Sequence, residues 1–284
     1  MVKKVCVLGA GTMGSGIAQV TAENGIETII RDMEDRFVQK GISTIKNFLA
    51  RKLEKGKISQ DQYNQTLALL KGTTNVHEAV EGVDMVIEAV PEDLALKVKT
   101  FAELDQLCPP KVILATNTST LSISKIASEV IHKDRVVGTH FFSPVPLMSL
   151  VEIIKGSQTT EAVIDTAREF CKQIGKTSII AKDIPGFIVN RFMCLLYNEA
   201  ADQIYNGMAS AEDIDLGMKL GANHPMGPVA IMDMAGVDVV YNALNALYQM
   251  TGEERYRPSP IFQNMIRENR LGRKTGLGFY DYKK

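Results

Sequence analysis

The sequence predicts an α/β protein, with a doubly wound N-terminal domain followed by an all-α C-terminal domain. Three observations lead to this prediction. Short apolar runs alternate with helix-like segments through the first part of the chain, as in a parallel sheet covered by helices. A glycine-rich turn follows the first apolar run. From Pro185 onward the strand pattern stops, so we place the domains at residues 1–184 and 185–284.

The N-terminal elements form one βαβ unit of about 30 residues. They are a strand at 3–8, a helix at 15–24 and a strand at 27–32. Residues 36–71 differ, because they are rich in charge and helical in pattern. Ser59 and Gln62 have the spacing of a capping box, which opens a second helix within this segment. We therefore expect a helical hairpin inserted between strands.

The alternation then resumes and ends near residue 181. Further strands are expected at 85–90, 112–116, 135–140, 150–154 and 178–181. Further helices of the first domain are expected at 97–108, 122–130 and 161–174, with Ser122 as an N-cap. In the second domain we expect helices at 188–205, 211–220, 228–250 and 261–268.

Composition narrows the class of protein. The net charge of -1 lacks the electrostatic footprint of a nucleic-acid-binding protein. No apolar run approaches the roughly 20 residues that span a bilayer, and the run that starts at Val5 is too short for a secretory signal. The four cysteines are scattered and lack metal-binding spacing, as expected of buried thiols in a reducing cytosol. We therefore expect a cytoplasmic protein with no nucleic-acid, membrane or metal partner.

The turn Gly9-Ala10-Gly11-Thr12-Met13-Gly14 follows a strand and opens a helix. This is the context in which three glycines bind a dinucleotide in a Rossmann-type domain. Gly9 permits the tight turn, Gly11 lets the backbone approach a pyrophosphate, and Gly14 lets the helix pack on the sheet. The N–H groups of the helix N-terminus, at Thr12 and Met13, then face the phosphates.

Asp32 ends the second strand, at the distance expected of the acid that binds the ribose hydroxyls. A carboxylate there repels a 2′-phosphate, which favours NAD over NADP. The neighbouring Arg31 keeps NADP open, because an inward guanidinium could accept that phosphate.

Oxidation of an alcohol needs a base, and histidine is suited to this role near neutral pH. His140 closes an apolar strand, at the end that faces the ligand crevice in such sheets. Glu152 lies in the next apolar strand, and the intervening loop can bring the two side chains together. The alternatives are a core histidine bonded to backbone and an edge-strand carboxylate that faces water. His77 and His132 lie in polar settings and are expected at the surface.

At these residues the chain resembles the L-3-hydroxyacyl-CoA dehydrogenases, and most closely their short bacterial members. The resemblance covers essentially the whole chain. Its markers are the glycine turn and the segments Ile87-Glu88-Ala89-Val90, Thr116-Asn117-Thr118-Ser119, His140-Phe141-Phe142, Pro185-Gly186-Phe187-Ile188-Val189-Asn190-Arg191 and Gly272-Arg273-Lys274-Thr275-Gly276.

The resemblance implies a role for each matching residue. His140 is the acid and base, Glu152 is its paired carboxylate, and Ser119 and Asn190 bind the substrate around its reacting oxygens. The positions implied to contact the cofactor, in addition to the glycine turn and Asp32, are Glu92, Lys97, Ser119, Ser143 and Lys274. Lys52, in the basic cluster with Lys55 and Lys57, matches a position that meets coenzyme A; a solvated helix face is the alternative for this cluster.

The implied activity is the NAD-dependent interconversion of (S)-3-hydroxybutyryl-CoA and acetoacetyl-CoA by a homodimer or a higher homo-oligomer. Two positions depart from the family pattern. Ser143 stands where the family usually has Asn, which puts a cofactor contact in doubt, and Ser149 replaces a common lysine. The alternatives are a dehydrogenase of a free hydroxy acid, such as a sugar acid, and a non-catalytic NAD-binding protein.

Overall fold

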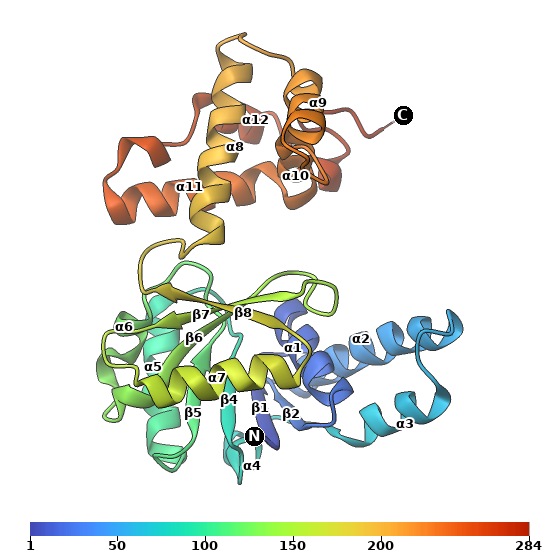
Figure 1. Cartoon of the computed structure of the whole chain (residues 1–284), viewed down its shortest axis with the longest axis vertical. Coiled ribbons are helices and arrows are strands. Elements are labelled where there is room, and N and C mark those ends of the chain that lie inside the picture. The colour runs from blue at the N-terminus through green and yellow to red at the C-terminus, as the bar shows by residue number, and fades with distance from the viewer. Residues whose placement is uncertain (284) are drawn as a thin grey trace. The chain divides into compact units, whose positions relative to one another are not determined.

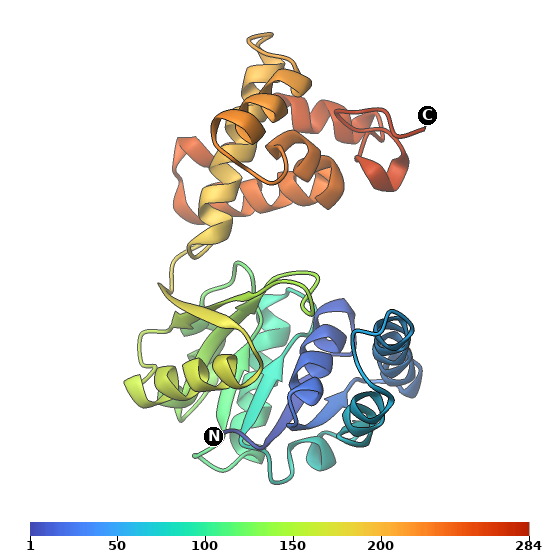
Figure 2. The ribbon, with the colours of Figure 1, turned by 45° about the vertical axis from the view of Figure 1, so that its right-hand side comes forward.

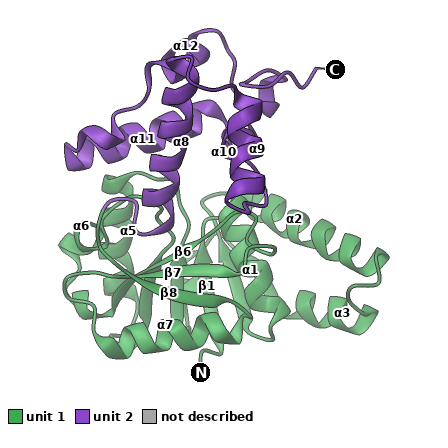
Figure 3. Ribbon diagram, turned by 45° about the horizontal axis from the view of Figure 1, so that its top comes forward, with its two compact units in different colours: residues 1–184 green, residues 185–284 purple. Residues whose placement is uncertain are grey.

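The computed structural model describes residues 1–283, which divide into two compact units. Unit 1 comprises Met1–Ile184, and unit 2 begins at Pro185 (Figure 3). Each unit has a hydrophobic core of its own. Over the described residues, no helix is both long enough and apolar enough to cross a membrane.

Unit 1 is built on a single sheet. Over residues 1–283 its strands are β1 (Lys4–Leu8), β2 (Glu27–Arg31), β3 (Leu70–Thr73), β4 (Met85–Glu88), β5 (Ile113–Thr116), β6 (Val136–Phe141), β7 (Leu150–Lys155) and β8 (Thr177–Lys182). They lie in the order β3-β2-β1-β4-β5-β6-β7-β8. Neighbouring strands run parallel except β6 and β7, which run antiparallel. The chain moves outward in both directions from β1, so the predicted doubly wound fold class is confirmed.

Helices cover both faces of this sheet. They are α1 (Thr12–Glu23), α2 (Asp35–Glu54), α3 (Gln60–Ala68), α4 (Val76–Val80), α5 (Leu94–Leu107), α6 (Ile123–Ile126) and α7 (Glu161–Gln173), with 3-10 turns η1 (Ala127–Glu129) and η2 (Lys133–Arg135). Figure 1 shows α7 across one face of the sheet and α5 against the other. Buried side chains of α1, α2 and α7 form one core with the strands. Because both faces are covered, the central strands β1, β4, β5 and β6 are buried along almost their whole length.

The inserted hairpin consists of α2 and α3, which lie side by side next to α1 (Figures 1 and 2). The predicted capping box is confirmed, because the Ser59 hydroxyl accepts from the Gln62 N–H and the Gln62 side chain accepts from the Ser59 N–H. The predicted end of the hairpin at residue 71 is wrong. Leu70–Thr73 forms β3, which pairs with the free edge of β2.

Two further helix predictions need correction. The expected helix at 122–130 is capped by the Ser122 hydroxyl, as predicted, but α6 ends at Ile126 and tightens into η1. The helix expected at 228–250 is two helices, because Gly236 has a φ of 108°. This conformation is outside the helical range and separates the two segments.

Unit 2 is helical, as predicted. Its helices are α8 (Val189–Tyr205), α9 (Ala211–Gly221), α10 (Pro228–Ala235), α11 (Val237–Thr251) and α12 (Pro260–Arg267), with 3-10 turns η3 (Glu254–Tyr256) and η4 (Arg273–Thr275). Its core includes Met232, Leu244 and Phe262. The buried Asp233 carboxylate accepts from the backbone N–H groups of Phe279 and Tyr280, which attaches the C-terminal segment to α10.

The cysteines are buried thiols. Burial raises the pKa of Cys171 to about 12 and that of Cys194 to about 11. They therefore stay protonated near neutral pH, which makes them poor nucleophiles. In the described part of the chain, no group of His, Cys, Asp or Glu side chains is arranged to hold a metal ion.

Candidate active site

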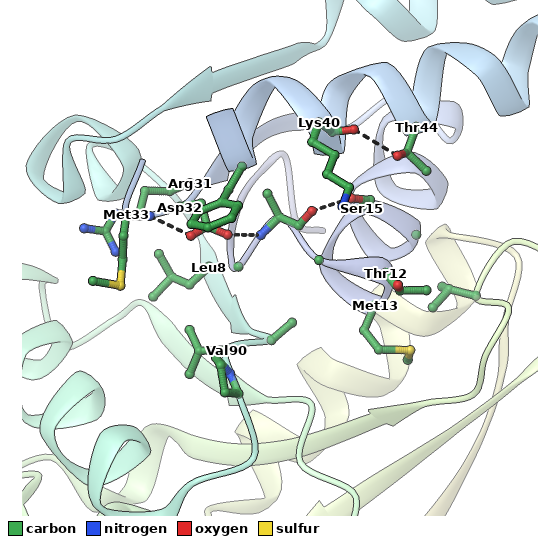
Figure 4. A pocket seen from close by; sticks show the side chains of 18 of the residues that line it. Leu8, Thr12, Met13, Ser15, Arg31, Asp32, Met33, Lys40, Thr44 and Val90 are labelled. Carbon is green, nitrogen blue, oxygen red and sulfur yellow. Dashed lines mark hydrogen bonds between the residues drawn. The ribbon is translucent and has the colours of Figure 1, made fainter. Parts of the chain in front are cut away.

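A cavity of about 790 Å³ opens in unit 1 at the carboxyl ends of β1 and β2 (Figure 4). Its walls are the glycine turn, one face of α2, the loop after β4 and the segment after β6. Ligands bind at this edge of doubly wound sheets. The predicted cofactor residues that line it are Gly9, Gly11, Thr12, Met13 and Asp32.

The glycine turn leaves room for a ligand and for its own helix. Gly9 has a φ of +100°, and a Cβ there would lie 2.5 Å from the carbonyl oxygen of Ala89. A Cβ on Gly14 would lie 1.8 Å from the carbonyl oxygen of Gly9, so α1 packs directly on the turn. A Cβ on Gly11 would meet nothing within 4 Å. Because Gly11 is the N-cap of α1, no side chain occupies the first helical N–H groups from that position, which fits a bound pyrophosphate.

Asp32 joins the end of β2 to this turn. Its Oδ2 accepts from the Ala10 N–H at 2.7 Å, and its Oδ1 accepts from the Met33 N–H at 2.7 Å. Arg31 also lines the cavity, but its Nε donates to the Thr74 carbonyl oxygen at 3.1 Å. A carboxylate held in this position accepts hydroxyl groups and repels a phosphate, as the NAD preference requires.

His140 and Glu152 lie opposite each other on the antiparallel pair β6 and β7. The His140 Nδ1 lies 2.7 Å from the Glu152 Oε2. Both side chains are buried, and the His140 ring also lies 4.5 Å from the ring of Phe142. The structure therefore brings together the two residues that the sequence suggested as a pair. Since a carboxylate only accepts, Nδ1 carries the proton of this hydrogen bond and Nε2 is the nitrogen available for proton exchange.

Lys97 belongs to α5, and its side chain lies inside the protein against the end of β4. Its side chain is 1% exposed, and its Nζ donates to the Glu88 Oε1 at 2.6 Å. Glu88 is fully buried and also accepts from the hydroxyl of Thr116 at 2.7 Å. Burial raises the pKa of Glu88, while the charge of Lys97 and its hydrogen bond oppose this shift. Lys97 does not line the cavity. A buried ammonium needs a carboxylate, and Glu88 supplies one.

Glu92 connects this buried pair to the predicted substrate residue Ser119. The Glu92 Oε2 lies 3.3 Å from the Lys97 Nζ. Its Oε1 accepts from the Thr118 hydroxyl at 2.6 Å and from the Ser119 N–H at 2.9 Å. Burial raises the pKa of Glu92, but these hydrogen bonds and Lys97 outweigh it and hold the pKa below its usual range. The ionised Glu92 thus fixes the backbone of the loop that carries Ser119.

The remaining predicted site residues have other surroundings within their own units. The Lys52 Nζ is 2.5 Å from the Glu23 Oε1, so α1 supplies its partner. Ser143 is exposed in the segment after β6. Asn190 and Lys274 belong to unit 2, where Asn190 lies in α8 and the Lys274 Nζ is 2.5 Å from the Asp238 Oδ1.

Three residues that position parts of the site were not predicted to do so. Glu88 had a sequence signal, because it is an acid at the end of an apolar strand, like Glu152. Asn117 accepts from the Phe141 N–H at 2.9 Å and so connects β5 to the residue after His140. Lys176 donates to the carbonyl oxygens of Val145 and Met148, both at 2.7 Å, and fixes the segment after β6. The last two contacts join distant parts of the chain and leave no local pattern.

Comparison with known proteins identifies relatives over the whole chain. The family model described as 3-hydroxyacyl-CoA dehydrogenase, NAD binding domain, matches residues 4–184. The model described as 3-hydroxyacyl-CoA dehydrogenase, C-terminal domain, matches residues 186–282. Together they account for both structural units.

Individual relatives agree with these matches. A 3-hydroxybutyryl-CoA dehydrogenase of Clostridioides difficile is 43% identical over 99% of this chain and 100% of its own length. Human mitochondrial hydroxyacyl-coenzyme A dehydrogenase is 39% identical over 100% of this chain and 92% of its own. The crystal structure of an (S)-3-hydroxybutyryl-CoA dehydrogenase from Ralstonia eutropha has a TM-score of 0.96 at 42% identity and covers 100% of both chains.

Proposed function

The chain belongs to the 3-hydroxyacyl-CoA dehydrogenase family, and from that premise we propose that it interconverts (S)-3-hydroxybutyryl-CoA and acetoacetyl-CoA with NAD as cofactor. The observation that carries the proposal is the buried His140–Glu152 pair. It supplies an acid and base at the sheet edge where the cavity opens. The relatives named above, similar over nearly their full lengths, support the four-carbon substrate.

The residues of the cavity fit the cofactor. Gly11 leaves open space at the start of α1, and Asp32 presents a carboxylate at the end of β2. When bound, NAD accepts a hydride from the alcohol carbon, and NADH returns it to the ketone. The side chains of this protein bind and orient the two reactants and move the proton.

We assign the proton transfer to His140 Nε2. In oxidation it takes the hydroxyl proton, and in reduction it returns a proton to the oxygen. Glu152 holds the ring by its Nδ1–H and stabilises the imidazolium that forms, because its negative charge lies 2.7 Å away in a buried setting. The Ser119 hydroxyl, on the loop fixed by Glu92, is assigned to the substrate oxygen.

The remaining assignments rest on the family resemblance. Asn190 is proposed to bind the substrate, and Lys52 is proposed to bind coenzyme A. The residues proposed to contribute to cofactor binding are Ser143, Glu92, Lys97 and Lys274. The contacts of Lys97 and Glu92 within unit 1 support an indirect role, in which they position the loop that carries Ser119. For Lys52 to bind coenzyme A, its ammonium group must leave the ion pair with Glu23 and pair with a phosphate group.

The substitution His140→Gln tests the proposed function. It removes the basic ring nitrogen while keeping a polar side chain of similar size, so kcat with acetoacetyl-CoA and NADH should fall by about two to four orders of magnitude. The affinity for NADH should stay at the wild-type value, since His140 does not line the cavity. Turnover near wild type would refute the assignment. Wild-type activity on acetoacetate in place of its coenzyme A ester would refute the substrate class.

The domain boundary, the homodimer and the cytoplasmic location stay predictions. Exposed apolar side chains of unit 2, among them Met208 and Leu220, support an assembly through this unit. Sedimentation equilibrium of the purified chain measures the number of subunits. Cell fractionation measures the location.

A further inference from the structure

One face of α2 forms a wall of the cavity in unit 1. The residues on this face that line the cavity are Phe37, Lys40, Thr44 and Phe48, which have the three- and four-residue spacing of one side of a helix. Lys40 is the cation of this face and lies between the two aromatic residues along the helix. The resemblance assigns no role to it.

The start of α2 lies directly on the glycine turn. A Cβ on Gly41 would lie 2.9 Å from the carbonyl oxygen of Ala10 and 3.0 Å from the Ser15 Oγ. The backbone of α2 therefore packs against the glycine turn at Gly41, the residue that follows Lys40. Figure 4 shows the Lys40 side chain extending from α2 toward Ser15, in the first turns of α1. The packing of the two helices thus places the Cα of Lys40 beside the glycine turn, with its side chain directed toward α1.

The charge of Lys40 is not neutralised by the protein. Three other basic residues of unit 1 have partners within the protein. Arg31, which lines the cavity, donates to a carbonyl oxygen, while Lys52 and Lys97, which do not line it, bind carboxylates. Within residues 1–283, Lys40 forms no ion pair. Glu103 and Asp32 also line the cavity, and Asp32 accepts two backbone N–H groups. A cation without a carboxylate, beside uncapped helical N–H groups, favours an anionic ligand.

We propose that Lys40 binds a phosphate group of a nucleotide in this cavity. Two ligands could supply this phosphate group, the dinucleotide cofactor and coenzyme A. The cofactor source follows from the NAD-binding domain, while the coenzyme A source rests on the proposed function. In either case the ammonium pairs with a phosphate oxygen as a point charge and supplements the backbone groups of the glycine turn.

The test compares Lys40→Met with Lys46→Met in the full chain. Lys46 is exposed on the same helix and does not line the cavity, so both variants lose one charge from α2. Isothermal titration calorimetry measures the affinity of each for NADH, NADPH, coenzyme A and adenosine. Lys40→Met should weaken at least one of the three phosphorylated ligands by roughly ten- to a hundredfold, the value of a charge-assisted hydrogen bond. Adenosine binding should not change, and Lys46→Met should behave as wild type.

The pattern of losses identifies the source of the phosphate. Weaker NADH and NADPH binding assigns the pyrophosphate, weaker NADPH binding alone assigns the 2′-phosphate, and weaker coenzyme A binding alone assigns that ligand. Lys40→Arg should restore most of the lost affinity. Wild-type affinity of Lys40→Met for all three would overturn the proposal. Turnover of acetoacetyl-CoA by the wild-type protein, measured separately, reports on the proposed function, so the two can fail independently.

Discussion

Replacing Lys97 by Met is the most direct test of the buried charges beside the site. The substitution leaves the Glu88 carboxylate without its ammonium partner in a position of 0% exposure. Removing one partner of a buried ion pair costs roughly 3–5 kcal/mol. Glu92 adds less, because its side chain is 40% exposed and solvent screens it.

Guanidinium chloride unfolding at neutral pH, followed by circular dichroism, measures this loss. With a slope of roughly 4 kcal/mol/M for a unit of this size, the midpoint of unit 1 should fall by about 1 M. The double variant Glu88→Gln/Lys97→Met removes the unpaired charge as well. It should therefore be more stable than Lys97→Met alone, although it contains one more substitution.

The pH dependence gives a second check. Burial raises the pKa of Glu88, and loss of Lys97 raises it further. When folding raises the pKa of a carboxyl group, the free energy of unfolding of the protein falls as the pH rises through that pKa. The deficit of Lys97→Met relative to wild type should thus shrink as the pH falls and Glu88 takes up a proton. A deficit that is absent at neutral pH, or that persists unchanged in the double variant, would refute this account of the pair.

Two further predictions concern the reaction itself. Glu152→Gln keeps the shape of the side chain but removes the charge that stabilises the imidazolium, so kcat should fall by roughly ten- to a hundredfold while the NADH affinity stays unchanged. Steady-state kinetics measures kcat, and NADH fluorescence titration measures the affinity. An unchanged kcat would argue against a catalytic role of the His140–Glu152 pair. Asp32→Asn keeps an acceptor for the Ala10 N–H but removes the charge that repels a 2′-phosphate, so the ratio of kcat/KM for NADPH to that for NADH should rise about tenfold. An unchanged ratio would place cofactor selection elsewhere, with Arg31 as the next residue to vary.

Features that depend on local spacing could be predicted from the amino-acid sequence. The glycine turn, Asp32 and the Ser59 capping box each lie within one or two neighbouring elements, so the residue pattern identifies the backbone conformation. The His140–Glu152 pair was also predictable, because one short connection joins their strands and each carries a polar group among apolar neighbours.

Features that depend on pairing between distant segments became visible in the folded chain. Leu70–Thr73 is a strand because the edge of β2 was open to it. Lys97 is buried because α5 places it against Glu88, and Lys40 faces the cavity because Gly41 lets α2 lie on the glycine turn. In the sequence, the strand is only a short polar stretch, and the two lysines are ordinary helix residues. A lysine on a helix can face solvent, pair with a buried carboxylate or bind a ligand. Which of these it meets is set by how whole elements pack, and that packing is determined by the combined burial of many apolar side chains far apart in the chain.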